Sequence, residues 1–125
     1  MNAETALHAR LLASSAVTAL VGERIYELRV PYTAPMPAIT YQKIDAGYFS
    51  TLTRSLSIAR PRIQVNCWAD TPDVAREVAQ AVRASLDGYD ANGVSAMILD
   101  AHVLPVSPDI SRAGIAQDYA IWETE

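Results

Sequence analysis

The sequence predicts an α+β fold, in which two helical regions pack on one face of an antiparallel sheet of about four main strands. Residues 62–86 read as a strand that passes directly into an amphipathic helix. Further segments alternate apolar and polar side chains with the period of two that half-buried strands show. A Ser/Thr-rich segment continues this alternation, which predicts a long hairpin arm. No internal repeat or low-complexity block interrupts the pattern.

The first helical region is expected at the N-terminus, where leucines form an apolar stripe on a helix over Ala3–Ala13. Ser14-Ser15 offers a break and a new cap, and a short second turn follows. Gly22 can end that turn with a left-handed backbone. Residues 24–27 form a short extended piece. Three prolines within residues 31–37 then predict an irregular approach to the sheet, because proline cannot donate to a strand ladder.

Two segments follow before the centre of the chain. Residues 38–44 are predicted to form a strand, with Ile39 and Tyr41 on one side. In the Ser/Thr-rich segment 48–58, Leu52, Leu56 and Ile58 keep a period of two against hydroxyl side chains. We therefore interpret residues 48–58 as part of the hairpin arm.

The central segment carries the clearest local signals. Ile63, Val65 and Cys67 alternate with polar residues, which indicates a half-buried strand. Thr71 is suited to cap a helix, and Pro72 fits the first helical position, where its missing N–H costs nothing. Apolar residues then recur at helical spacing: Val74, Ala75, Val78, Ala79, Val82 and Leu86. Gly88 is placed to end this helix.

The C-terminal part predicts two more strands. Residues 94–104 form the first, with Met97, Leu99, Ala101 and Val103 on one face, and residues 117–123 form the second. A turn-rich stretch over 88–93 precedes this pair, and a loop over 105–114 joins its two strands.

Composition limits the classes of function. The 125 residues suit a single domain over 1–125, and half of them are hydrophobic. A net charge of −4 argues against nucleic-acid binding by charge alone. The single cysteine excludes an internal disulfide framework and suits a reducing compartment. The N-terminus lacks the basic region of a signal peptide, and no apolar stretch approaches the ~20 residues of a membrane span. We expect a soluble protein made in the cytoplasm, without membrane contact.

Candidate catalytic groups are few. Cys67 fits a small buried hydrophobic residue better than a nucleophile, because no activating base accompanies it. Asp100 and His102 lie two apart on a strand and share a face, but no further ligands stand at the spacing of a metal site. The five glycines are dispersed and form no phosphate-binding loop. We therefore predict no enzymatic activity, no metal and no cofactor.

One stretch has an unusual charge. No acidic residue occurs from Ala46 to Ala69, whereas Arg54, Arg60 and Arg62 do. On a projecting hairpin these arginines would face an acidic partner or a nucleic-acid backbone. Equally, they could be solvated side chains that prevent aggregation through the edge.

Aromatic and apolar residues give a second indication of a partner. Trp68 is predicted on the face of its strand opposite Ile63, Val65 and Cys67, a face that the helices leave open. Aromatic side chains are enriched at interfaces, although the proline-rich segment or the arm could cover this one instead. The candidate partner contacts are therefore the three arginines together with Leu52 and Leu56 of the arm and Trp68.

The order of these segments resembles that of the tail-completion, or tail-terminator, proteins of long-tailed bacteriophages and gene-transfer particles. The resemblance lies in LHARLLAS, ALVGERIYEL, APMPAITYQKI, RIQVNCWADTPDVAREVAQAVRASLDG and DYAIW, in this order. It covers nearly the whole chain through packing and turn patterns, without a chemical motif. The segments 48–58 and 105–114 lie outside it.

The resemblance implies a structural role in the virion tail or neck. Such subunits assemble into a ring, usually sixfold, on the head-proximal end of the tail tube, and the ring stops tube polymerisation. The implied partners are further copies of the chain, the tail-tube protein, the head-side connector, and DNA that passes through the lumen without sequence-specific binding. From charge and pattern we add that the arm reaches a neighbouring subunit by strand addition, and that Arg54, Arg60 and Arg62 face the lumen or an acidic ring.

Three alternatives stay open. A head-side connector or stopper protein is also a small ring-former. A small α+β enzyme would use Asp100 and His102, and a ligand-binding module would hold a small molecule between the hairpin and a helix as a monomer.

Overall fold

The computed structural model describes residues 3–29, 35–45, 48–50, 55–59, 62–91, 94–103 and 113–123. Within them lie three helices and eight strands. The helices are α1 (Ala3–Ala13), α2 (Ser15–Val21) and α3 (Pro72–Leu86). The strands are β1 (Ile25–Glu27), β2 (Ala38–Asp45), β3 (Tyr48–Ser50), β4 (Ser55–Ala59), β5 (Arg62–Ala69), β6 (Asp90–Ala91), β7 (Val94–Val103) and β8 (Ala113–Glu123).

Six strands form one sheet in the order β1-β2-β5-β8-β7-β6. The four long strands β2, β5, β8 and β7 pair antiparallel, as their alternation predicts. β1 pairs in parallel with β2, so the sheet is mixed and not wholly antiparallel. The α+β class is therefore confirmed, and the predicted four-stranded sheet is extended by a short strand at each edge.

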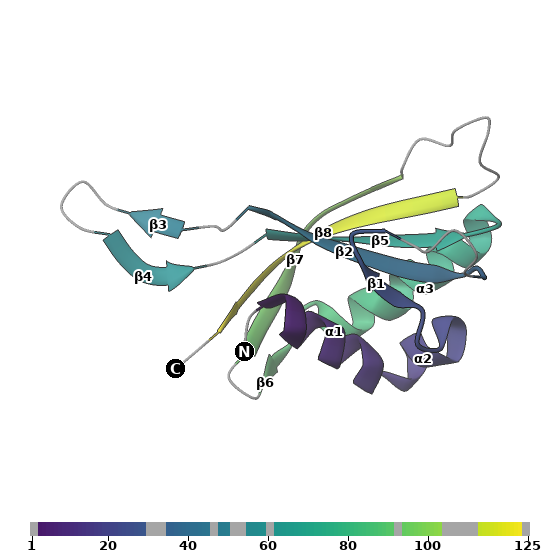
Figure 1. The fold of residues 1–125 in the computed structure, drawn as a ribbon, viewed down its shortest axis with the longest axis horizontal. Helices are drawn as coiled ribbons and strands as arrows, with labels where there is room; N and C mark the ends of the chain where they lie inside the picture. Colours follow the sequence, from purple (N-terminus) through teal and green to yellow (C-terminus); the bar gives the residue numbers. More distant parts are fainter. Residues whose placement is uncertain are drawn as a thin grey trace.

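The three helices lie on one side of the sheet, as Figure 1 shows. The N-terminal helical region consists of two helices, and α3 packs against β5 and β8. The core between the two layers is apolar and contains these buried residues: Leu7, Leu11, Val17, Val21, Ile39, Ile63, Val65, Val78, Val82, Leu86, Tyr119 and Ile121. None of the described helices is long and apolar enough to cross a lipid bilayer.

Local caps explain where the helices begin and end. The Val17 N–H donates to Ser14 Oγ at 3.4 Å, and the Val74 N–H donates to Thr71 Oγ1 at 3.3 Å. Pro72 occupies the first position of α3, as predicted. Gly22 follows α2 directly and Gly88 follows the C-cap Asp87 of α3, and their φ angles of 60° and 78° favour glycine at such helix ends.

α1 is fixed to both layers by polar contacts at its inner surface. His8 Nδ1 and the Tyr41 hydroxyl of β2 lie 2.8 Å apart. Arg10 Nε donates to the Ser85 carbonyl of α3 at 3.0 Å, and its guanidinium lies 4.4 Å from the ring centre of Tyr89. These contacts hold α1 across the sheet and beside the end of α3.

The predicted hairpin arm is present as a separate two-stranded sheet. β3 and β4 pair antiparallel, with Tyr48 opposite Ala59 and Ser50 opposite Ser55. The arm projects beyond the ends of β2 and β5, away from the helices (Figure 1). Residues 51–54 of this segment lie outside the described residues.

β7 differs from its prediction because it contains a bulge. Ile98 lies opposite Tyr119 and Asp100 lies opposite Asp118, so Leu99 is an extra residue between two consecutive partners. A bulge shifts every later side chain to the other face. Met97 therefore shares a face with Asp100 and His102, and the predicted face with Leu99, Ala101 and Val103 is wrong.

The predicted loop over 105–114 is also corrected at its end. Ala113 and Gly114 pair with Ala69 and Trp68 and so begin β8. Residues 105–112 lie outside the described residues.

Candidate assembly surface

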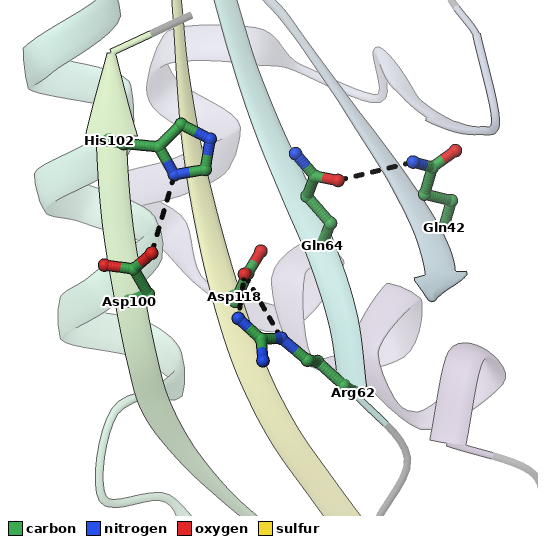
Figure 2. Close-up of polar contacts among 6 residues, drawn as sticks. All are labelled: Gln42, Arg62, Gln64, Asp100, His102 and Asp118. Atoms are coloured by element: carbon green, nitrogen blue, oxygen red, sulfur yellow. Dashed lines mark hydrogen bonds and ion pairs between the residues drawn. The ribbon is translucent and has the colours of Figure 1, made fainter. Parts of the chain in front are cut away.

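The sheet face opposite the helices, here called the open face, is built from the polar positions of the alternating strands. In β5, Ile63, Val65 and Cys67 are buried toward the helices, whereas Arg62, Gln64 and the other even-numbered residues face away. The antiparallel register aligns Gln64 with Gln42 of β2 and Asp118 of β8, and Asn66 with Thr40 of β2. The other open-face positions of β8 that pair with β5 are small residues: Gly114, Ala116 and Ala120. Figure 2 shows six side chains of this face: Gln42, Arg62, Gln64, Asp100, His102 and Asp118.

An ion pair lies at the centre of the open face. Arg62 donates to Asp118 Oδ2 through Nη2 at 2.5 Å and through Nε at 3.2 Å (Figure 2). The Asp118 side chain is 8% exposed and that of Arg62 is 42% exposed. Asp118 also lies directly opposite Asp100 of β7, an arrangement of like charges that destabilises a strand pair. Arg62 offsets this repulsion, so part of its charge is used within the chain.

Two further contacts connect β2 to β5. Gln42 Nε2 donates to Gln64 Oε1 at 3.3 Å, which Figure 2 shows as a cross-strand pair. Trp68 Nε1 donates to Thr40 Oγ1 at 3.0 Å, and the indole is half-buried. The predicted placement of Trp68 opposite the helix-facing residues of β5 is confirmed.

Two acceptor atoms on the open face have no hydrogen-bond partner among the described residues. They are Asn66 Oδ1 and Asp118 Oδ1, and both atoms are buried. Buried oxygen atoms of this kind are ordinarily bonded to protein or water. The open face is therefore a polar surface whose own side chains leave acceptors unused.

The geometry gives no support to a catalytic pair at Asp100 and His102. His102 Nδ1 lies 3.7 Å from Asp100 Oδ2, beyond hydrogen-bond distance, and both side chains are about half exposed. Within the described residues, no cluster of three His, Cys, Asp or Glu side chains could hold a metal ion. The arrangement is a solvated pair on the open face.

The single cysteine is chemically quiet. Cys67 is fully buried toward the helices, and burial raises the pKa of its thiol to about 12. A thiol with so high a pKa stays protonated at neutral pH, and the thiolate is the nucleophilic form. This agrees with the interpretation of Cys67 as a small buried hydrophobic residue.

The structure describes only some of the candidate partner contacts that the sequence predicts. Arg62 and Trp68 lie together on the open face, each already bonded within the chain. Leu56 lies in β4. Leu52, Arg54 and Arg60 lie outside the described residues.

Exposed apolar side chains mark a second surface, along β7 at the edge of the sheet. Met97, Leu99 and Val103 are 45%, 47% and 75% exposed. β6 pairs only with the first two residues of β7, so the rest of this edge has no strand beside it among the described residues. The chain thus presents an open polar face, a partly apolar strand edge and a projecting arm.

A family model described as tail completion protein gp17 matches residues 5–119. The chain belongs to this family. The matched range begins within α1 and ends within β8, so it includes most of the open face and the β7 edge. The family resemblance seen in the sequence is confirmed.

A solved structure agrees with this assignment. The tail completion chain is similar to a chain in the structure titled "Virion of native gene transfer agent (GTA) particle". The two share 25% sequence identity with a TM-score of 0.68, over 94% of this chain and 91% of that chain. No match is found among curated proteins.

Sequence reasoning missed Asp118 as a member of the open face, and it missed the contact between Gln42 and Gln64. Each stands at a polar position of an alternating strand, which is the signal that could have placed them on one side of the sheet. Which strands are neighbours depends on the strand order, and the alternation alone contains no information about it.

Proposed function

We propose that this protein is a virion component that forms a ring on the head-proximal end of the tail tube. The observation that carries the proposal is the family match over residues 5–119. The likeness to a chain of a gene transfer agent virion supports it, because it extends over 94% of this chain. The ring stops the polymerisation of the tube and joins the tail to the connector on the head side.

A closed ring of identical copies requires a head-to-tail interface, in which two different surfaces of the chain meet. The arm projects from one end of the sheet, and the open edge of β7 extends toward the other (Figure 1). Two unlike surfaces at opposite ends suit a ring better than a two-fold dimer, which uses one surface twice. We propose six copies in the ring.

The proposed partners are other copies of the chain, the tail-tube protein and the head-side connector protein. The role is structural and needs no catalytic step, metal or cofactor. DNA passes through the lumen without sequence-specific contact. Arg54 and Arg60 are proposed to face this DNA or an acidic partner ring, since residues 46–69 contain no acidic side chain.

The test is to mix the purified protein with its cognate tail-tube protein during tube growth. We expect short tubes with a ring at one end by negative-stain microscopy, and a shift of the protein to ring mass on a sizing column. Tube protein that polymerises alone under the same conditions is the control. Unchanged tube length together with a protein that stays monomeric would overturn the proposal and favour the head-side connector instead.

A further inference from the structure

The outer edge of β7 is open over its second half. β6 covers Val94 and Ser95, and the segment before it reaches only to Ile98, whose N–H donates to Asp87 Oδ1 at 3.1 Å. Among the described residues no strand pairs with this edge from Leu99 to Val103. An edge with unpaired backbone groups is a template for an added strand.

The side chains of this segment also suit a strand partner. All five residues from Leu99 to Val103 are exposed, although they belong to β7. Apolar residues alternate with Asp100 and His102, and Val103 is the most exposed large apolar side chain described. An added strand would bury this apolar row.

β4 of the arm offers a matching edge. It pairs with β3 on one side, and no described strand pairs with its other edge, although part of β4 lies near β8. Its sequence SLSIA alternates apolar and hydroxyl residues, as the β7 edge alternates apolar and polar ones. An isolated two-stranded hairpin is at best marginally stable in water, so the arm needs a surface to pair with.

The arm cannot reach the β7 edge of its own chain. One cross-strand row joins Ile98, Tyr119, Ile63 and Lys43. From this row the arm leaves in one direction, through Asp45 and Arg62, and residues 99–103 extend in the other. β5 and β8 also lie between β2 and β7 (Figure 1). None of the described strands of the same chain is placed to cover residues 99–103, which favours a strand from another molecule.

Charge identifies that molecule as a second copy of this chain. Three acidic residues lie on this side of the sheet: Asp100 within the open segment, and Asp87 and Asp90 beside the covered first half of β7. β4 is flanked in the sequence by Arg54 and Arg60, within a stretch that contains no acidic residue. A basic strand and an acidic edge attract one another and disfavour pairing of either surface with itself.

We propose that β4 of one copy adds as a strand to the outer edge of β7, Leu99–Val103, of a second copy. This proposal rests on the proposed ring, whose head-to-tail interface it specifies. Because donor and acceptor are different surfaces at opposite ends of the chain, each copy accepts one arm and donates one.

The first test places a charge in the acceptor edge. Leu99→Lys is compared with Leu12→Lys, a leucine of α1 that is 40% exposed and lies on neither the open face nor the β7 edge. We expect Leu99→Lys to raise the protein concentration needed for ring formation on tubes by about tenfold or more. Leu12→Lys should leave it near the wild-type value. Equal effects of the two variants overturn the proposal, and thermal melting of both variants checks that the fold is intact.

The second test detects the contact directly. Ser57→Cys protein is mixed with Asp100→Cys, Ala101→Cys or His102→Cys protein and oxidised, because paired strands bring Cβ atoms within disulfide reach. At least one mixture should give a covalent dimer on a denaturing gel, whereas Met97→Cys should give none. Cys67 is buried in every variant and does not interfere.

The outcomes separate this proposal from the proposed function. Rings that cap tubes normally, with Leu99→Lys harmless and no cross-link at any position, overturn the strand contact alone. A cross-linked dimer from a protein that leaves tube length unchanged supports the strand contact and overturns the role at the tail tube.

Discussion

The two faces of the six-stranded sheet are formed by the same strands. They differ in how many of their buried polar atoms lack a hydrogen-bond partner among the described residues. On the helix-covered face, Gln117 Nε2 donates to the Ala79 carbonyl at 3.0 Å, and the Tyr119 hydroxyl donates to Gln117 Oε1 at 2.7 Å. Most other side chains of that face, among them Ile39, Ile63 and Ile121, are apolar and pack in the core. Gln117 and Tyr119 are thus hydrogen-bonded, and most apolar side chains of this face are buried, by contacts within the chain.

The open face is bonded less completely. Its ion pair and its glutamine pair hold three strands together, yet Asn66 Oδ1 and Asp118 Oδ1 have no described partner. One such atom, Ser85 Oγ, also occurs in α3, so the difference between the faces is one of degree. The comparison indicates that the helix-covered face supplies most of the core packing, and that the open face and the β7 edge are the surfaces available to the proposed partners.

The largest expected effect compares two isoleucines of β2. Ile39 is fully buried against the helices and Ile44 is half exposed. Ile39→Ala should lower the free energy of unfolding by about 2–5 kcal/mol, because it removes buried methyl groups and leaves a cavity. Ile44→Ala should lower it by less than about 1 kcal/mol. Urea denaturation measures both, and similar losses would contradict the assignment of the core to Ile39 and its helix-facing neighbours.

The next effect appears at high pH. Burial raises the pKa of the Cys67 thiol from 9.0 to about 12, so the folded state keeps its proton where the unfolded state loses it. This contribution is complete below pH 9 and is lost as the pH rises from 9 toward 12. At pH 11 the loss is about 3 kcal/mol, since each pKa unit corresponds to about 1.4 kcal/mol.

The matched control is Cys67→Ala, whose unfolding free energy is followed by urea denaturation from pH 8 to pH 11. Burial also raises the pKa of Tyr119, so the variant still loses some stability in alkali. The difference between the two proteins isolates the thiol. Parallel curves for wild type and variant would show that Cys67 is accessible to solvent in the folded state.

Local signals predicted the fold where one segment determines its own structure. The 27 residues from Arg62 to Gly88 contain the alternation of a strand, a helix cap and a glycine suited to end a helix. The structure has β5 and α3 in this stretch, as predicted. The parallel pairing of β1 with β2 depends on contacts between separate segments, which no local pattern contains. The sequence does not reveal the bulge at Leu99, because an apolar residue at this position continues the alternation of apolar and polar side chains. The backbone breaks that alternation there, since Leu99 has no partner in β8.

For the candidate site too, the sequence predicts what one strand determines by itself and not what depends on the order of the strands. Trp68 and the polar residues of β5 were placed on the correct face, because alternation within one strand decides that. The partner of Arg62 lies 56 positions away in β8, so only the strand order reveals it. The sequence groups Arg62 with the basic residues of the arm, whereas the strand order places it in an ion pair with Asp118 on the open face.

The smallest effect concerns this ion pair. Asp118→Asn removes the charge that Arg62 binds, but it also removes the repulsion between Asp118 and the opposite Asp100. Because Arg62 is partly exposed, solvent screens its attraction to Asp118. We therefore expect a net loss of about 1 kcal/mol or less in the free energy of unfolding.

A double-mutant cycle separates the two contributions, with Arg62→Gln as the second substitution. The coupling energy between Arg62 and Asp118 should be favourable and should shrink in high salt, because ions screen partly exposed charges. The cycle repeated in an Asp100→Asn background should show a larger cost of Asp118→Asn, since the opposing repulsion is then absent. A loss comparable to that of Ile39→Ala would mean that the open face stabilises the fold as strongly as the helix-covered face, and the comparison between the two faces would fail.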